Sequence, residues 1–509
     1  MSTGKRAIRR KKINSVIVIG SGFSGLVSSL LLARAGIGVT LLERSSQVAP
    51  LLRNYDHEGF EVNHGFHYLG GFYPGGALRN CFEQLGIAEK LTPINVNDDG
   101  FDVFSGITDT KIIMPVGIER VRPVLERAFP GSGEALQKYF ELLEKVFREF
   151  SFFSIESFFY KGTPDLTSVS LHDFLKGHHA EEKLIDFLGA YSQMLLGLSA
   201  KECSMLSHLL GVGAYFFSAQ TFHKGGGALV AALEEQVRRA GVRILTDCEA
   251  VHVLCEERRH FTGVRMRSLA DGSESVLEAD ACISTIHPKR LLRLIQDSSA
   301  HHLFLQRISE YSDTQAVCVF HLAVDKEAAG KFVNNCHVYK KSINGRPKHH
   351  LTLLPDFSGN RNATAHERQM TVLMSPWDNE DHPDCPERLE GSCGAAERLH
   401  VGGNPPVTAA YLQRAEDDMA ARLEDAFPEL KGRYRVIDTV TPCHFDRLNA
   451  TWDGSIYGVR CSLNRLGMST VGPMRGLFLA GQSVTAPGIF GVLVSAYLAC
   501  NRITGNIIL

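Results

Sequence analysis

Three glycines near the start of the chain, Gly20, Gly22 and Gly25, follow the β-prone run Val16–Ile19 in the spacing Gly-x-Gly-x-x-Gly. The first glycine permits a tight turn, the second lets the backbone approach a pyrophosphate, and the third lets a helix pack closely on a strand. Glu43 ends the next apolar run, where a carboxylate can accept hydrogen bonds from ribose hydroxyls. Since an acid there disfavours a 2′-phosphate, the pattern predicts bound FAD or NAD rather than NADP.

Candidate reactive side chains are few. His64, His67 and Tyr68 lie close together, and Lys224 precedes a run of three glycines. An imidazole exchanges protons near neutral pH, although each histidine could equally be an ordinary hydrogen-bonding group, and Lys224 could hold a carbonyl or cofactor oxygen rather than act as an acid. No Ser/His/Asp constellation and no paired-carboxylate motif stands out, which favours hydride chemistry carried by a cofactor.

The elements that position these residues begin with a β-α-β unit. After Gly25 an apolar stripe at helical spacing runs to Gly36, and Val39–Leu42 is a second buried strand. The region 118–210 is mostly helical and rich in phenylalanine. The pattern further predicts a helix over 409–426, a surface loop over Asp378–Pro406, and strands at 242–245, 251–254, 261–266, 279–283, 316–322, 351–354 and 370–374.

The far end of the chain carries a second glycine-rich pattern, GLFLAGQ at 476–482 followed by PGIFGV at 487–492. With EGFEVNHGFHYLG at 58–70, MLLGLS at 194–199 and FHKGGGA at 222–228, the sequence resembles the phytoene desaturase, carotenoid isomerase and retinol saturase superfamily of flavoproteins. The resemblance spans nearly the whole chain from Val16. It departs from the family pattern at Ala49-Pro50-Leu51, where Gly-Gly-Arg or Gly-Gly-x is usual, and at Asn63, where Asp is usual.

The resemblance implies FAD as the cofactor, with NAD(P)H as a candidate external reductant. It implies a second helix N-terminus at the flavin, where backbone N–H groups stabilise negative charge. The implied catalytic residues are His67, Tyr68 and Lys224, with no metal. The expected cofactor-binding residues are Gly20, Gly22, Gly25, Glu43, Arg44, His64, Val251, Gly481, Gln482, Gly488, Gly491 and Val492.

The expected fold class is α/β, with a discontinuous Rossmann-type FAD-binding domain and an inserted mixed-sheet and helical substrate domain. We assign residues 13–90, 215–290 and 440–509 to the FAD-binding domain, and residues 91–214 and 291–439 to the substrate domain. A cavity between them is expected to be apolar, because phenylalanine is abundant and Arg or Lys pairs that could clamp an anion are scarce.

Composition and charge bear on nucleic-acid binding, on the cellular compartment and on membrane association. With 54 Lys+Arg against 56 Asp+Glu, the chain has no global field that would gather nucleic acid. The 12 cysteines are scattered, as in reduced cytoplasmic proteins. The uncharged stretch 476–501 has glycines, Pro487 and polar residues at its centre, which favours strand, loop and helix over a membrane span. The basic segment Lys5–Lys12 reads as a solvated arm, with peripheral membrane contact as the alternative. No pattern specifies an oligomeric state.

The sequence therefore predicts an FAD-dependent oxidoreductase that acts on C=C bonds of a long, apolar polyene by saturation, isomerisation or desaturation. The His-Tyr-x-Gly and Ala-Gly-Gln details favour reduction or isomerisation. Reductive cyclisation of a polyene is an alternative, as is oxidation of an amine, although no aromatic cage is recognisable. A flavin-free lipid-binding escort protein is a third, suggested by Ala49-Pro50-Leu51.

Overall fold

The computed structural model describes residues 12–149, 164–256, 260–295, 302–342, 345–375, 409–463 and 468–505. Its first sheet is parallel, in the order β10-β2-β1-β14-β20. The strands are β1 (Ser15–Ile19), β2 (Gly38–Leu42), β10 (Arg243–Leu245), β14 (Ala281–Ser284) and β20 (Leu477–Leu479). The predicted β-α-β unit is confirmed, with helix α1 (Phe23–Arg34) between β1 and β2.

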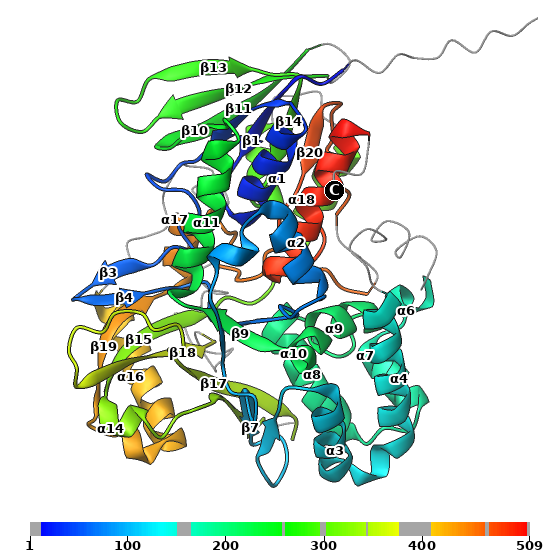
Figure 1. The fold of residues 1–509 in the computed structure, drawn as a ribbon, viewed down its shortest axis with the longest axis vertical. Coiled ribbons are helices and arrows are strands. Elements are labelled where there is room, and N and C mark those ends of the chain that lie inside the picture. Colours follow the sequence, from blue (N-terminus) through cyan, green and yellow to red (C-terminus); the bar gives the residue numbers. More distant parts are fainter. Residues whose placement is uncertain are drawn as a thin grey trace, which may run out of the picture.

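Both faces of this sheet are covered (Figure 1). One face packs on α1, α11 (Gly225–Arg239) and α18 (Gly488–Thr504). Over the other face lies an antiparallel sheet of β11 (Cys248–Glu256), β12 (His260–Ser268) and β13 (Glu274–Glu278), together with α12 (Pro288–Leu294). Burial on both faces explains why β1 and β14 are continuous apolar runs rather than alternating ones.

A second, mixed sheet of seven strands has the order β19-β15-β18-β17-β16-β7-β8. Helices α14 (Lys326–Ala329) and α16 (Ala409–Ala426) pack on it through a shared apolar cluster. The strands are β7 (Asp102–Ser105), β8 (Ile112–Met114), β15 (Cys318–Asp325), β16 (Asn335–Lys341), β17 (Pro347–Pro355), β18 (Glu367–Met374) and β19 (Tyr434–Val440). The sheet supplies one wall of the pocket described below.

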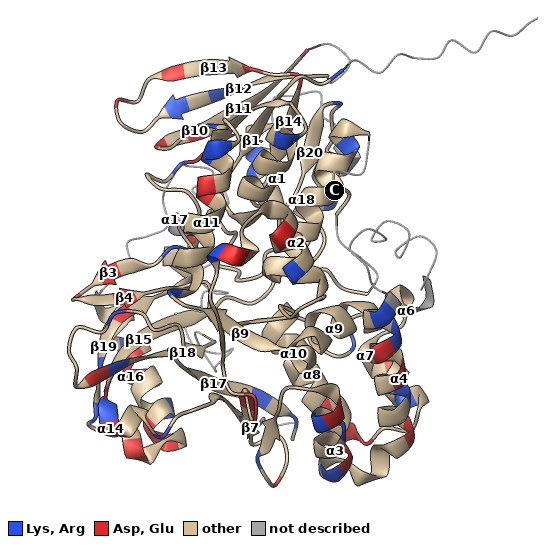
Figure 2. Ribbon diagram, viewed as in Figure 1, with Lys and Arg blue, Asp and Glu red and all other residues tan. Residues whose placement is uncertain are grey.

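A helical block adjoins the β7 end of this sheet (Figure 1). Its helices are α3 (Ile118–Ala128), α4 (Gly133–Glu149), α6 (Pro164–Ser168), α7 (Leu171–Gly177), α8 (Glu182–Leu196), α9 (Met205–Gly211) and α10 (Gly213–Phe217). Charges of both signs alternate along α3, α4 and α7 (Figure 2). Phenylalanines such as Phe140 and Phe187 fill the core, while Phe150, Phe152, Phe153, Phe158 and Phe159 lie outside the described residues.

Short strands and helices connect the parallel sheet to the seven-stranded sheet and the helical block. Strands β3 (Tyr55–His57) and β4 (Phe60–Val62) form a hairpin, and β5 (Leu69–Gly70), β9 (Ala219–Phe222) and β6 (Pro93–Asn95) form a small sheet. The other connecting helices are α2 (Ala77–Leu85), α13 (His302–Ser309) and α17 (Pro442–Asn449). The loop between β4 and β5 carries His64, His67 and Tyr68.

All five strands of the parallel sheet come from the segments 13–90, 215–290 and 440–509. The exact domain boundaries stay a prediction. Among the described helices, none is long and apolar enough to cross a membrane, and the described residues contain no cluster of His, Cys, Asp and Glu that could hold a metal. The basic residues 5–11 and the expected surface loop Asp378–Pro406 lie outside the described residues.

Candidate active site

The glycine turn after β1 leaves an open space at one position only. A Cβ on Gly25 would lie 2.0 Å from the Gly20 carbonyl oxygen, so this glycine lets α1 pack against the turn. Gly20 has a φ of +93°, which favours glycine. A Cβ on Gly22, by contrast, would have no neighbour within 4 Å. The N-terminus of α1 therefore faces free space beside Gly22, as a pyrophosphate requires.

Glu43 stands at the end of β2 with only 8% of its surface exposed. Its Oε2 accepts hydrogen bonds from the backbone N–H of Ser21, at 2.9 Å, and from the Ser21 hydroxyl. Its Oε1 accepts one from the Ser45 N–H at 2.8 Å. Because an ionised carboxylate has about four acceptor positions, one remains for a ribose hydroxyl. Glu43 thus braces the glycine turn in addition to the cofactor role that we expect.

Arg44 follows β2 of the parallel sheet, and Val251 lies on β11 of the antiparallel sheet. The Arg44 guanidinium donates to the backbone carbonyl of Arg447, just C-terminal to the middle of α17. In the β11–β12 ladder, Ala250 pairs with Met266 and His252 with Arg265, so the register skips Val251. Such a bulge takes a residue's backbone out of the ladder. The backbone of Val251 is therefore left out of the β11–β12 ladder, and its contact with a cofactor stays a prediction.

The two departures from the resembled family pattern have local explanations. Ala49 adopts a φ of +48°, the left-handed conformation that glycine favours, and its N–H donates to the Ser21 hydroxyl at 3.1 Å. The Asn63 amide oxygen accepts from the N–H groups of Gly65 and Phe66, while its NH2 donates to the Leu52 carbonyl at 2.7 Å. An ionised aspartate could not make that donation, so Asn63 ties the two loops together.

The C-terminal glycine segment forms a second turn and helix start, and α18 begins at Gly488 as predicted. Gly481 has a φ of +116° and donates its N–H to Ser495 Oγ at 2.8 Å. Gln482 and Val492 are partly buried beside it. A Cβ on Gly488 would have no neighbour within 4 Å. Gly22 and Gly488 thus both lie at helix starts that border open space.

Gly491 has a packing reason to be glycine, and its expected contact with the cofactor stays a prediction. Its Cβ would lie 2.3 Å from the Ala486 carbonyl oxygen. Gly491→Val should therefore lower the stability of the whole protein by about 1–3 kcal/mol through overpacking. Gly488→Val is strained by the φ of +80°, but its side chain would meet no neighbouring atom. For the same loss of stability, we expect Gly488→Val to lower the flavin content more than Gly491→Val does. Thermal melting and flavin content measure both; a Gly491→Val protein as stable as the wild type would contradict the packing explanation.

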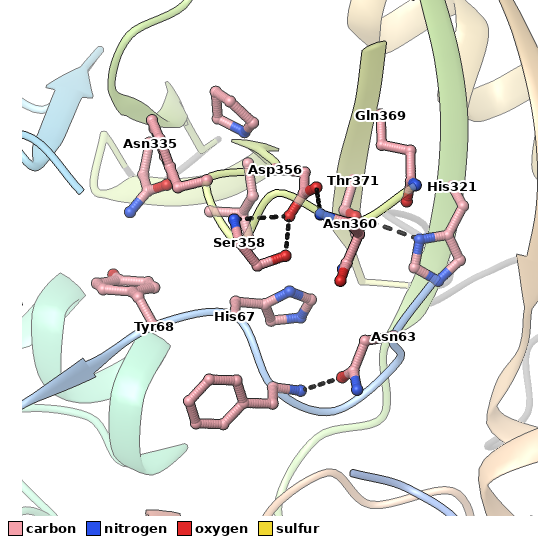
Figure 3. Close-up of a pocket in the computed structure, with 14 residues that line it drawn as sticks. Asn63, His67, Tyr68, His321, Asn335, Asp356, Ser358, Asn360, Gln369 and Thr371 are labelled. Atoms are coloured by element: carbon pink, nitrogen blue, oxygen red, sulfur yellow. Dashed lines mark hydrogen bonds between the residues drawn. The ribbon is translucent and has the colours of Figure 1, made fainter. Parts of the chain in front are cut away.

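A pocket lies where the β4–β5 loop meets the seven-stranded sheet (Figure 3). His67 points into its middle and Tyr68 closes one side (Figure 3). The lining residues are Asn63, Phe66, His67, Tyr68, His321, Asn335, Leu354, Pro355, Asp356, Phe357, Ser358, Asn360, Gln369 and Thr371. The expected apolar cavity is thus not what this pocket presents, because polar side chains of the loop and sheet dominate its lining.

Many of these polar groups are already engaged with one another. Asp356 accepts from the N–H of Ser358 at 3.0 Å and from the N–H of Asn360 at 3.2 Å. Gln369 Nε2 donates to the carbonyls of Glu61 and Arg361. Burial raises the pKa of Asp356. Since their hydrogen bonds are satisfied by protein, these groups can line a pocket for an apolar molecule without being left unpaired.

Tyr68 is anchored by a buried carboxylate. Its hydroxyl donates to Asp102 Oδ2 at 3.1 Å, as does the hydroxyl of Tyr191, and the Asn335 amide donates to Oδ1 at 3.1 Å. Asp102 has no exposed surface. Burial and the Asp102 charge raise the pKa of Tyr68 well above its usual value. Tyr68 therefore stays a phenol, with its oxygen free to accept a hydrogen bond.

The structure brings His67 and Tyr68 to one pocket, but it leaves Lys224 outside the lining. Lys224 is exposed, has a φ of +63°, and caps α11; its N–H donates to the Ser358 carbonyl at 2.8 Å. Its carbonyl accepts from Asn54 Nδ2 at 2.9 Å. Lys224 therefore supports the pocket through its backbone, and a catalytic role for its ammonium stays a prediction.

Burial lowers the pKa of His64 and of His67 to about 4, and that of His208, inside the helical block, to about 3. In the unfolded chain these groups titrate near pH 6.5, so acid favours unfolding. This contribution to stability is full above pH 6.5 and is lost as pH falls from 6.5 toward 4.

The free energy of unfolding should fall by about 2 kcal/mol per histidine between pH 7.5 and pH 5. Urea unfolding at the two pH values measures it, and His208→Gln should reduce the difference. Equal stability at both values would contradict the assignment of buried neutral histidines.

Comparison with known proteins decides the family. Residues 23–504 match the family model described as flavin containing amine oxidoreductase. The chain belongs to this family. This match confirms the predicted class, a flavin-dependent oxidoreductase with an α/β fold. An oxidoreductase from Methanosarcina mazei shares the fold at a TM-score of 0.63 and 16% identity, covering 95% of this chain and 98% of that one.

Two relatives extend the comparison. An all-trans-retinol 13,14-reductase of Danio rerio is 25% identical to this flavoprotein, covering 96% of this chain and 86% of the relative. A 4,4'-diapolycopene oxygenase of Methylomonas is 24% identical and covers 61% of this chain and 63% of the relative. The first similarity includes both the parallel-sheet half and the pocket.

Sequence reasoning missed several residues of the site. Asp102 opens β7, and His321 interrupts the otherwise apolar strand β15. A single ionisable residue in a buried strand was the available signal, because such a group needs a partner. Asn335 and Thr371 lie on strands β16 and β18, and only the sheet register brings them to the pocket.

Proposed function

We propose that this flavoprotein binds FAD and changes C=C bonds of a long, apolar, conjugated molecule, in the reducing or isomerising direction. The observation that carries the proposal is the similarity to a retinol reductase over 96% of this chain. That similarity covers the strands that would hold the cofactor and the loop that carries His67 and Tyr68. Reductive cyclisation of a polyene is the alternative outcome at the same pocket.

The residues present fit FAD. We propose that Gly20, Gly22 and Gly25 bind its pyrophosphate and that Glu43 binds its adenosine ribose. Val251, His64 and the second glycine turn from Gly481 to Val492 complete the proposed cofactor contacts. The fit rests on the open space at Gly22 and Gly488, each at the start of a helix. Bound flavin supplies hydride transfer at a carbon atom.

The chain's own residues position the substrate and exclude water. The Tyr68 hydroxyl donates to Asp102, which leaves its oxygen able to accept a hydrogen bond in the pocket. Burial keeps His67 neutral at pH 7, so it can both donate and accept a hydrogen bond there. We propose that these two side chains border the bond that changes.

Replacing them tests this placement. His67→Ala or Tyr68→Phe should slow turnover by about 10²-fold, the usual contribution of a positioned proton-transfer group, while FAD stays bound. Steady-state kinetics and flavin content measure the effect. Tyr215→Phe, a neighbouring aromatic ring in contact with Tyr68 at 5.1 Å, is a packing control. Full turnover in both site variants would remove them from the reaction.

The decisive experiment starts from the visible spectrum of the purified protein. A flavin spectrum, followed by anaerobic titration with NADH and then NADPH, identifies the cofactor and any nicotinamide reductant. Reduced protein is then mixed with polyenes and isoprenoids, with putrescine and hydroxy acids as polar controls, and product mass is measured. A product two hydrogens heavier selects saturation, whereas an unchanged mass with altered absorption selects isomerisation.

Two results would overturn the proposal. A colourless protein without flavin in its denatured supernatant would favour the escort alternative. Turnover of an amine with none of any polyene would favour amine oxidation, whose enzymes share this fold.

We further propose that the basic segment Lys5–Lys12 contacts membranes, which sedimentation with anionic and with neutral vesicles tests.

A further inference from the structure

A chain of hydrogen bonds crosses the interior from a partly exposed carboxylate to the pocket. Asp438 Oδ2 accepts from the Tyr55 hydroxyl at 2.6 Å. The Tyr55 oxygen lies 3.0 Å from His64 Nδ1, and that nitrogen lies 3.1 Å from His321 Nε2. His321 Nδ1 lies 3.2 Å from Thr371 Oγ1. His321 and Thr371 line the pocket.

The sheet register builds the fixed part of this chain. Strand β15 lies between β18 and β19, and His321 is directly opposite both Thr371 and Asp438. The other two members come from the β3–β4 hairpin and the loop after it. There the Tyr55 and His64 rings pack with centroids 4.2 Å apart, and His64 and His321 with centroids 5.3 Å apart. The β3–β4 hairpin with its following loop thus meets three strands of the seven-stranded sheet on one continuous path.

Burial separates the middle of the path from its ends. His321 is 2% exposed and His64 is 9% exposed, whereas Asp438 and Thr371 are only partly buried. Desolvation lowers the pKa of both histidines, so both are neutral at pH 7. Asp438, His444, His67 and His57 are the titratable groups that act on His64.

Each side chain between the carboxylate and the pocket can both donate and accept a hydrogen bond, and at His64 one nitrogen, Nδ1, faces both of its neighbours in turn. Hydroxyls and neutral imidazoles have this property, which apolar side chains lack. Apolar residues would fill the same interior volume without the cost of burying two imidazoles. The retained chain of such groups therefore points to proton movement along it.

We propose that Asp438, Tyr55, His64, His321 and Thr371 form a relay that carries a proton between solvent and the pocket. The proposal rests on the proposed function, because saturation of a C=C bond adds a hydride, supplied by bound flavin, and one proton. The carbanion left at the neighbouring carbon takes the Thr371 hydroxyl proton as a C–H bond forms. His321 Nδ1 restores that proton and accepts another at Nε2 from His64. For this, Asp438 first takes a proton from a hydronium ion in solvent, which reverses its hydrogen bond with Tyr55. Tyr55 then passes its own proton to His64 Nδ1 and takes the proton of Asp438.

Tyr55→Phe tests the relay by removing one oxygen atom. We expect kcat with a polyene to fall by about 10²-fold, while KM, flavin content and the rate of flavin reduction stay unchanged. The solvent deuterium isotope effect on kcat should increase. Tyr434→Phe is the matched control, because Tyr434 also donates to a carboxylate, that of Glu424, but is not a member of the relay. It should behave as wild type.

A second variant tests the relay if the Tyr55→Phe protein does not fold. Thr371→Val is nearly isosteric and cuts the chain at the pocket, so it should show the same lower kcat and larger isotope effect. Wild-type kcat and isotope effect in a folded Tyr55→Phe or Thr371→Val protein would overturn the relay.

A readout without turnover separates this inference from the proposed function. In protein labelled with 15N at histidine, Asp438→Asn should shift the ring nitrogen signals of both His64 and His321, because the chain couples them. Unchanged His321 signals would overturn the relay. If wild-type protein converts no polyene while these signals shift together, the proposed function fails and the coupled chain stands.

Discussion

Glu43→Ala protein should be isolated largely without flavin. The substitution removes the acceptor that fixes Ser21 in the glycine turn and Ser45 beyond the strand. It also removes the proposed acceptor for the ribose. The one charge-assisted hydrogen bond that Glu43 can still make to the ribose contributes about 1.5–3 kcal/mol, so its loss alone should make FAD dissociate about 10- to 10²-fold more readily.

Flavin absorbance per protein and titration of the apoprotein with FAD measure this loss. Glu278→Ala, at an exposed position on the edge strand β13, is the control and should retain full flavin. Stoichiometric flavin in Glu43→Ala protein would show that Glu43 serves the turn alone.

Asp102→Ala should destabilise the protein more than any other single change considered above. It leaves the buried hydroxyls of Tyr68 and Tyr191 and the Asn335 amide without their acceptor. Each buried polar group left unpaired costs about 1–3 kcal/mol, so the loss should total about 3–9 kcal/mol.

Denaturant unfolding measures the loss, and Asp102→Asn, which keeps the volume and one acceptor oxygen, should recover part of it. Asp109→Ala is the control, since its side chain is 88% exposed. If Asp102→Ala unfolds at the wild-type midpoint, the carboxylate is not the anchor of Tyr68.

The parallel sheet could be predicted because its strands carry strong local signals. In β1, four β-prone residues lead into the glycine motif, and α18 begins after Pro487 as expected. The strands β13, β16 and β19 were missed. Their sequences, such as ESVLE in β13 and NCHVYKK in β16, mix charged and polar residues. These strands form through pairing with neighbours rather than through their own composition.

The candidate site likewise contains some residues that a local motif reveals and others that only the tertiary structure brings together. His67 and Tyr68 could be found because they lie in one short motif. His321 lies 257 residues from His64, and no local pattern links the two. Asp102 likewise meets Asn335 across 233 residues. Such contacts depend on tertiary register, and neither periodicity nor spacing encodes it.

The position of β1 at the centre of its sheet sets the order of events during synthesis. Its neighbour β14 ends at Ser284, and the edge strand β20 ends at Leu479. A ribosome must therefore complete almost the whole chain before the parallel sheet can close and α18 can cover α1. Until then the part of α1 that α18 covers stays exposed, so we expect the nascent chain to need protection from aggregation. A chain truncated before residue 477 lacks both β20 and α18, and we expect that added flavin cannot rescue it.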